Sequence, residues 1–269
     1  MKVYQKVLLI IGTVCMILFV LYGIPVVSDR MEPVVGFDSR LIWYLLCIFL
    51  LFVIGRMQGG GEYSRLNHRL RELDRELINH HRIDYYIIQN KNLYKETKDP
   101  KYRAIIMTNI ATAYHHDGKY EKSNNVISNI HLKDLSENQQ ATIFNQQFLN
   151  YVNMGKLDEA GKIYAAHKSL FEKYENNKEY KNHYIVSRLL YELALAEQEQ
   201  DKIKKIRQSF DTIRISKRAY PRAYQYRLLE GKLLIAEGNG KEGREHLRLL
   251  QKEHLMPGMK REVAKAIRF

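Results

Sequence analysis

The sequence predicts an all-α protein in which a membrane-spanning helical hairpin precedes an α-solenoid built from helix pairs. Two long apolar segments stand at the N-terminus, and apolar residues recur at helical spacing through the rest of the 269 residues. Gly and Pro residues separate the periodic segments, and no stretch alternates with period two for long enough to form a strand. A content of 45% hydrophobic and 27% charged residues excludes a disordered polyampholyte and a polytopic transporter.

The first apolar segment, Val7–Val27, runs for 21 residues without a charged side chain. As a helix it spans roughly 31 Å, which is about the thickness of the hydrocarbon core of a bilayer. A cleaved signal peptide is the alternative, since Lys2 and Lys6 precede the segment. The segment is longer than a signal-peptide core, and no small-residue cleavage site follows, so we expect an uncleaved membrane helix.

The second apolar segment, Leu41–Gly55, lies between Arg40 and Arg56. Its helix covers only roughly 22 Å, so it crosses the bilayer if both arginines extend toward the interfaces, giving a span of about 41–57. Trp43 fits the aromatic belt of a membrane interface. A buried helix of a soluble domain is the alternative, but the segment is apolar on all sides, unlike a surface helix.

The distribution of Lys and Arg predicts the orientation of residues 1–57, the membrane anchor. Lys2 and Lys6 precede the first span. A cluster of arginines begins at the end of the second span and continues after it: Arg56, Arg65, Arg69, Arg71 and Arg75. We therefore expect both termini in the cytoplasm, with the short connection 28–40 outside. This arrangement predicts a two-span protein of a bacterial plasma (inner) membrane, with the arginine cluster next to anionic lipid.

A Gly-rich linker at 58–61 separates the anchor from residues 62–269, the helical repeat domain. The domain holds 38 Lys and Arg against 27 Asp and Glu residues, a net charge of +11. Cys15 and Cys47 are the two cysteines of the chain, and both fall in the predicted membrane helices. This excludes a disulfide framework and makes a Cys-ligated zinc site improbable.

The domain contains an internal repeat marked by its turns. Gly118, Gly155, Asp201 and Gly238 occupy equivalent turn positions, which are 37, 46 and 37 residues apart. A helical pair within 62–99 precedes these copies, and a capping helix, Met259–Phe269, follows Pro257.

From residue 104 to 269 this pattern resembles the tetratricopeptide repeat family, whose period is about 34 residues. Small residues stand where the two helices of a repeat approach each other: Ala111, Ala194 and Gly231 on the first helix, and Ser123, Ala160 and Gly243 on the second. Phe148 and Ile206 are large at such positions, and Asp201 replaces a turn glycine. The resemblance implies a superhelix with an extended concave face.

In that family the first helix of each repeat lines the concave face and holds a peptide. The matching positions are Thr108, Thr112, His115, Asn145, Leu149, Arg188, Tyr191, Gln225 and Lys232. They form a groove of mixed polarity, suited to an extended or helical peptide. The positions at which some members grip a C-terminal carboxylate hold Thr108, Thr112 and Gln146, so the sequence does not support that clamp.

Motifs of catalysis and cofactor binding are absent from the sequence, including the phosphate-binding glycine loops, H-E-x-x-H and G-x-S-x-G. The histidine pairs His80-His81 and His115-His116 are neighbours in sequence, so on a helix their side chains diverge by about 100°. Chelation by a helix needs side chains three or four residues apart. We therefore expect neither an enzyme, nor a cofactor, nor a metal site.

These observations favour a membrane-anchored scaffold or adaptor whose cytoplasmic domain binds a protein or peptide partner at the bilayer. The net charge leaves an alternative, in which the basic solenoid binds nucleic acid or an anionic lipid or polymer. Tyr220, Tyr224 and Tyr226 lie beside arginines, an arrangement that stacks bases in some proteins but more often belongs to a helical core. Nucleic acid is the less favoured partner, and the sequence does not set the oligomeric state.

Overall fold

A computed structural model describes residues 63–196, 199–220 and 223–268. The chain divides into two compact units, Met1–Arg71 and Glu72–Phe269, and the second unit holds most of the described residues. The predicted spans at 7–27 and 41–57 and the linker at 58–61 lie outside the described residues. Among the helices that are described, none is both long and apolar enough to cross a bilayer.

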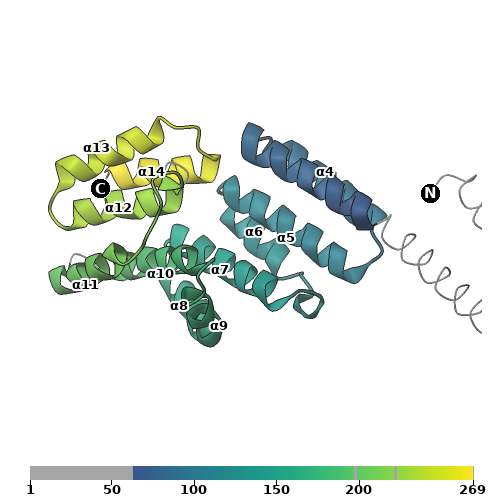
Figure 1. Cartoon of the computed structure of the whole chain (residues 1–269), viewed down its shortest axis with the longest axis horizontal. Helices are drawn as coiled ribbons and strands as arrows, with labels where there is room; N and C mark the ends of the chain where they lie inside the picture. Colours follow the sequence, from purple (N-terminus) through teal and green to yellow (C-terminus); the bar gives the residue numbers. More distant parts are fainter. Residues whose placement is uncertain (1–62, 197–198, 221–222, 269) are drawn as a thin grey trace, which may run out of the picture. The chain divides into compact units, whose positions relative to one another are not determined.

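Regular structure in the described residues is entirely helical, which confirms the all-α prediction (Figure 1). A helix at 63–80 and α4 form the two helices predicted within 62–99. The elements that follow the helix at 63–80 are α4 (Ile83–Glu96), α5 (Pro100–His116), α6 (Tyr120–Ile127), the short 3-10 helix η2 (Leu132–Asp134), α7 (Glu137–Asn153), α8 (Leu157–Ala166), α9 (Lys168–Glu175), α10 (Lys181–Leu195), α11 (Gln200–Asp211), α12 (Tyr224–Ala236), α13 (Gly240–Gln251) and α14 (Pro257–Arg268).

Local sequence signals fix where the helices of the site begin. The Asp99 side chain accepts a hydrogen bond from the backbone N–H of Tyr102, and Pro100 occupies the first position of α5, where its missing N–H costs nothing. Ser136 and Gln139 form a reciprocal capping box at the start of α7. At the start of each helix, a side chain therefore accepts a hydrogen bond from a backbone N–H group that has no partner within the helix.

The predicted turn glycines end the first helix of three helix pairs. Gly118, Gly155 and Gly238 have φ values of +70°, +72° and +91°, a conformation that side chains with a Cβ rarely adopt. The fourth predicted turn is wrong, because Asp201 lies in the first turn of α11. The extra helix α9, inserted between α8 and α10, accounts for the longer spacing of 46 residues before this position.

Close contacts within the helix pairs confirm most of the small-residue positions. The Ser123 hydroxyl donates to the carbonyl oxygen of Ala111 at 2.9 Å, and a Cβ on Gly243 would lie 2.7 Å from the carbonyl oxygen of Gly231. Ala194 is exposed, however, so its assignment to such a contact was wrong. The misplaced turn at residue 201 shifted the whole third copy of the repeat along the sequence.

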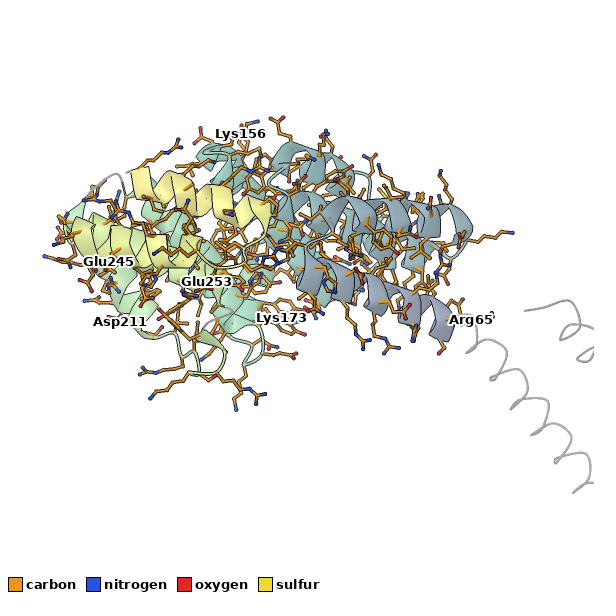
Figure 2. The ribbon with its side chains drawn as sticks, turned by 90° about the horizontal axis from the view of Figure 1, so that it is seen from above. Arg65, Lys156, Lys173, Asp211, Glu245 and Glu253 are labelled. Carbon is orange, nitrogen blue, oxygen red and sulfur yellow. The ribbon has the colours of Figure 1, made fainter. Side chains whose placement is uncertain are left out.

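The largest part of the core joins α7, α8, α9 and α10 through aromatic rings. Phe148 is almost fully buried and lies with its ring 5.8 Å from Phe171 and 5.3 Å from Tyr191. This explains how a large residue occupies a position where the repeat pattern expects a small one: α9 supplies Phe171 as an additional packing partner. Charged side chains such as Lys156, Lys173 and Glu245 project outward from the surface (Figure 2).

The last helix returns to the beginning of the domain. α14 packs against α12 and α13, its neighbours in sequence, and also against α5. Gly258 makes the approach to α5 possible, because a Cβ there would lie 2.8 Å from the carbonyl oxygen of His115 and 2.9 Å from the backbone nitrogen of Gly118. The first helix pairs and the last helix of this unit are therefore in direct contact.

Candidate functional site

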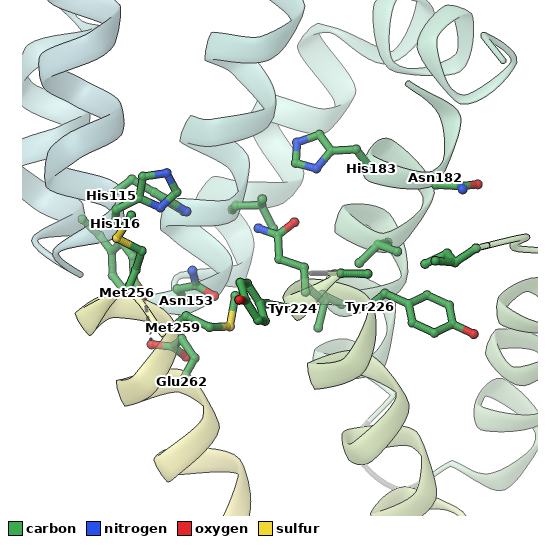
Figure 3. Close-up of a pocket in the computed structure, with 17 residues that line it drawn as sticks. His115, His116, Asn153, Asn182, His183, Tyr224, Tyr226, Met256, Met259 and Glu262 are labelled. Atoms are coloured by element: carbon green, nitrogen blue, oxygen red, sulfur yellow. Dashed lines mark hydrogen bonds between the residues drawn. The ribbon is translucent and has the colours of Figure 1, made fainter. Parts of the chain in front are cut away.

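A cavity of about 380 Å³ lies among α5, α7, α10, α12 and α14 (Figure 3). This size is in the range of pockets that bind small ligands or short peptide segments. It is lined by side chains from α5, α7, α10, α12 and α14, from Tyr120 at the start of α6, and from the connections before α12 and α14. The lining residues are His115, His116, Tyr120, Leu149, Asn153, Asn182, His183, Val186, Leu190, Ile215, Ala223, Tyr224, Gln225, Tyr226, Met256, Met259 and Glu262.

The contact between α14 and the start of α6 forms one wall of the cavity. The Tyr120 hydroxyl donates to Glu262 Oε1 at 3.2 Å, and Lys265 Nζ lies 2.9 Å from the same oxygen. Lys265 also donates to the carbonyl oxygen of Asn153, and Arg261 donates to that of Asp117. Burial, together with the Glu262 carboxylate, raises the pKa of Tyr120 well above its usual value, so the hydroxyl keeps its proton and remains a donor.

A buried chain of hydrogen bonds holds the His115 ring in place. Ser123 Oγ accepts from Gln146 Nε2 and from Asn150 Nδ2, both at 3.0 Å. Asn150 Oδ1 in turn lies 2.6 Å from His115 Nδ1. Because Asn150 presents an oxygen to the ring, Nδ1 of His115 carries the proton and Nε2 is an acceptor. The network extends to Thr112, whose hydroxyl donates to Gln146 Oε1 at 2.8 Å.

Two more imidazoles line the cavity. His183 Nε2 lies 2.9 Å from Asn145 Nδ2, an amide donor, which leaves the proton of this ring on Nδ1. The rings of His115 and His116 meet edge to face, with centroids 5.6 Å apart. Desolvation within the cavity lowers the pKa of all three histidines, of which His183 is the most exposed to solvent; for His116 desolvation with the neighbouring His115 and His81 lowers it to about 3. The imidazoles are therefore neutral near pH 7 and offer both donors and acceptors.

The remaining walls are largely apolar. Leu149, Val186 and Leu190 come from α7 and α10, and Met256 and Met259 from the beginning of α14. Figure 3 shows the two thioethers on the side of α14, opposite His183. Methionine adapts its shape to what it contacts, so the α14 side is the more adaptable wall.

The structure brings three of the predicted groove residues together in the cavity: His115, Leu149 and Gln225. Thr112 and Asn145 lie behind it, where each makes a hydrogen bond to another side chain of the two networks. The Thr108 hydroxyl donates to the carbonyl oxygen of Ala104 in its own helix and does not line the cavity.

Arg188 and Tyr191 do not line the cavity. Arg188 pairs with Glu175 of α9 at 3.0 Å and with Glu192 at 2.7 Å, and Tyr191 packs its ring on Phe148. The helix α9, which the sequence pattern does not include, supplies Glu175 to Arg188. A role of Arg188 and Tyr191 in partner binding stays a prediction. The face of α10 that meets the cavity carries His183, Val186 and Leu190 instead.

Lys232 does not line the cavity, although it shares a face of α12 with Gln225, two turns away. Its ammonium group forms no hydrogen bond or ion pair within the described residues. Burial lowers the pKa of Lys232, and the Glu262 carboxylate opposes that shift. Lys232 is thus a half-buried cation on α12.

The arginines predicted to face the membrane are exposed where they are described. Arg65, Arg69, Arg71 and Arg75 lie on the surface of the helix at 63–80, and Figure 2 labels the first of them; Arg56 is outside the described residues. Two of the tyrosines of the group at the start of α12 make contacts within the domain. Tyr220 donates to Glu230 at 2.7 Å, and Tyr226 stacks on Phe210 with ring centroids 4.5 Å apart.

Sequence reasoning did not identify His183, Met256, Met259 or Glu262 as residues of the site. The last three lie on or next to the capping helix, whose existence was predicted but whose contact with α5 was not. One signal was available, since an acidic residue on the apolar face of a terminal helix, as Glu262 is, indicates a buried polar contact.

Comparison of the chain with protein-family models, with curated proteins and with solved structures finds no match. In the part of the chain that the structure describes, no group of three or more His, Cys, Asp or Glu side chains is arranged to hold a metal ion. The geometry of the cavity is therefore what indicates function.

Proposed function

We propose that the chain is a membrane-anchored adaptor whose helical domain binds a short segment of a protein partner in the central cavity. The observation that carries the proposal is the cavity itself, about 380 Å³ in volume and lined by side chains from six helices. It combines apolar walls with a few oriented polar groups, as binding sites generally do. The tetratricopeptide-like arrangement of the helix pairs supports a protein segment as the occupant, because such arrays present their concave face to peptides.

The polar groups of the cavity are held in fixed orientations before anything binds. His115 is fixed by Asn150 and His183 by Asn145, and both amides belong to α7. Preorganisation of this kind lowers the entropic cost of association and favours a defined occupant over nonspecific adsorption.

A substitution that fills the cavity tests this proposal. Ala223 lines it just before α12, so Ala223→Trp places a large ring in the space that a partner would occupy. Ala165→Trp on the exposed face of α8 is the matched control. The full-length chain and both variants are purified from their own cells in detergent, with nuclease and stepwise salt washes, and the retained proteins are identified by mass spectrometry.

We expect a protein that is retained by the wild type and by Ala165→Trp and is lost with Ala223→Trp. When that protein is purified, it has to bind directly to the wild type and to Ala165→Trp but not to Ala223→Trp. An identical set of proteins with all three chains, at unchanged thermal stability, contradicts the proposal.

The connection between α11 and α12 supports a second candidate function, binding to an anionic membrane surface. Arg214, Lys217 and Arg218 are exposed there and form no ion pair within the described residues, and residues 212–220 contain no acidic side chain. Each such cation contributes about 1 kcal/mol near an anionic leaflet.

Hydrogen exchange of residues 212–220 tests this second function, with the full chain reconstituted in nanodiscs of phosphatidylcholine with or without phosphatidylglycerol. Protection that needs the anionic lipid and disappears when all three cations are changed to Gln supports it. Equal exchange in both kinds of nanodisc contradicts it.

A further inference from the structure

The walls of the cavity offer no free charge to an occupant. Among the lining residues in the described part of the chain, only Glu262 carries a fixed charge. Its carboxylate is already engaged, because Lys265 Nζ lies 2.9 Å from Oε1 and the Tyr120 hydroxyl donates to the same oxygen at 3.2 Å. A charged side chain that entered the cavity would therefore lose hydration without meeting a free opposing charge, which is costly.

The polar groups that remain available in the cavity are neutral, and together they both donate and accept hydrogen bonds. The Gln225 side-chain amide forms no hydrogen bond within the described residues, so its oxygen and its N–H groups are free. His115 Nδ1 is engaged with Asn150, and desolvation lowers the pKa of the ring, so Nε2 is a neutral acceptor. A peptide unit has one N–H donor and one C=O acceptor, and it is an uncharged group that matches this set.

Side chains with free apolar surface complete the walls. Ile215, Met256 and Met259 line the cavity and are half-buried, so part of each remains to contact an occupant. Figure 3 shows the Tyr224 ring next to the thioether of Met259. Thioethers and aromatic rings pack well against aliphatic and aromatic groups of varied shape. This part of the cavity therefore favours apolar side chains.

We infer that the occupant of the cavity is an uncharged segment of aliphatic or aromatic residues, held through its main chain by the Gln225 amide. Its side chains pack on Ile215, Met256 and Met259, and no Asp, Glu, Lys or Arg lies within the enclosed part. The net positive charge of the domain does not contribute to this contact, so ionic strength has little effect on affinity. This inference rests on the proposed function, since it names the chemistry of the segment that the cavity binds.

A displayed library of random linear peptides, flanked on both sides by Gly-Ser linkers, is the probe. The linkers keep both charged termini away from the cavity, so that selection reports side chains and main chain alone. The target is the full-length protein in phosphatidylcholine nanodiscs, because detergent competes for an apolar cavity. Peptides that also bind Ala223→Trp are discarded.

We expect the selected peptides to share a run of uncharged apolar residues. Replacing one residue of this run by Glu, and separately by Lys, weakens binding at least about tenfold, whereas the same changes outside the run have little effect. The dissociation constant changes less than about twofold between about 50 and 300 mM NaCl.

Gln225→Leu tests the main-chain contact, because it keeps the approximate size of the side chain and removes its amide. It weakens the binding of selected peptides about three- to tenfold, with no change for Gln208→Leu, the same substitution at an exposed position of α11. Replacing single peptide bonds of the run by esters removes one N–H at a time. One such ester gives a similar loss on the wild-type protein, which tests the contact even if Gln225→Leu does not fold.

A shared charged residue inside the run, or binding that weakens severalfold as the salt concentration rises, overturns the inference and leaves the proposed function standing. Equal affinity for the wild type and Gln225→Leu, with no loss from any ester, also overturns it. Failure of any peptide to distinguish the wild type from Ala223→Trp counts against the proposed function itself. The failure of the inference and the failure of the proposed function are therefore distinguishable.

Discussion

Tyr120 and Glu262 are 142 positions apart in the sequence, and their side chains are joined by a hydrogen bond of 3.2 Å. This contact joins α14 to the beginning of α6, and both residues line the same side of the cavity. Glu262 is 6% exposed, so the bond lies inside the domain, where an unpaired polar group is costly. The enclosure of the cavity therefore depends on a contact between distant parts of the chain.

Gly258→Ala is expected to destabilise the domain by about 1–3 kcal/mol. The added Cβ would lie 2.8 Å from the carbonyl oxygen of His115 and 2.9 Å from the backbone nitrogen of Gly118, and backbone atoms cannot move aside cheaply. Gly240→Ala is the control, because the nearest group there is the end of the flexible Arg244 side chain. Urea unfolding of both variants measures the difference; equal free energies of unfolding would show that α14 does not rest on α5.

Ser123→Ala is expected to cost about 1–3 kcal/mol of stability, more than an exposed Ser→Ala change. The Ser123 hydroxyl accepts from Gln146 and Asn150 and donates to the carbonyl oxygen of Ala111, so its loss removes the acceptor of Gln146 Nε2 and one of the two acceptors of the buried Asn150 amide. Ser128→Ala, on an exposed turn, is the matched control. Denaturant unfolding gives the free energies, and a loss no larger than that of the control would mean that the network does not support His115.

Helix content, element order and most turns were predictable because they depend on local signals. The periodicity of apolar residues, the Asp99-Pro100 start of α5 and the glycine at 118 each act within a few residues. The helix α9 was missed because the family pattern has two helices per repeat, and this error misplaced Asp201 and Ala194 within the repeat. The return of α14 to α5 is a contact between distant segments, and no local pattern encodes it.

The candidate site was predictable to the extent that it depends on one face of each helix. The positions of His115, Leu149 and Gln225 follow from helical spacing. His183 lies in the first turn of α10, so its prediction required knowing where that helix begins. Met256, Met259 and Glu262 required the tertiary contact of α14. The sequence thus predicted three of the residues that line the cavity but not those that α14 contributes.

The stability of the domain is expected to fall as the pH drops below about 6.5, and His116 is a principal cause. Burial and the neighbouring His115 and His81 lower the pKa of His116 from 6.5 to about 3 in the folded protein. Between about pH 3 and pH 6.5 the unfolded chain binds more protons than the folded one. The free energy of unfolding therefore rises with pH across this range, and it is lower at pH 4 than at pH 7. His115, also lowered by burial but partly compensated by Glu262, and His183 act in the same direction.

His116→Gln removes the titrating group and should flatten this dependence, whereas His131→Gln, at an exposed position before η2, should leave it unchanged. The measurement is urea unfolding of the full-length protein and both variants at several pH values between 4 and 7.5. If the wild type and His116→Gln lose stability in parallel as the pH falls, then His116 is not protonated on unfolding in this range. The acid sensitivity would then have to be assigned to other groups, and the neutral state of the imidazoles in the cavity would lose its support.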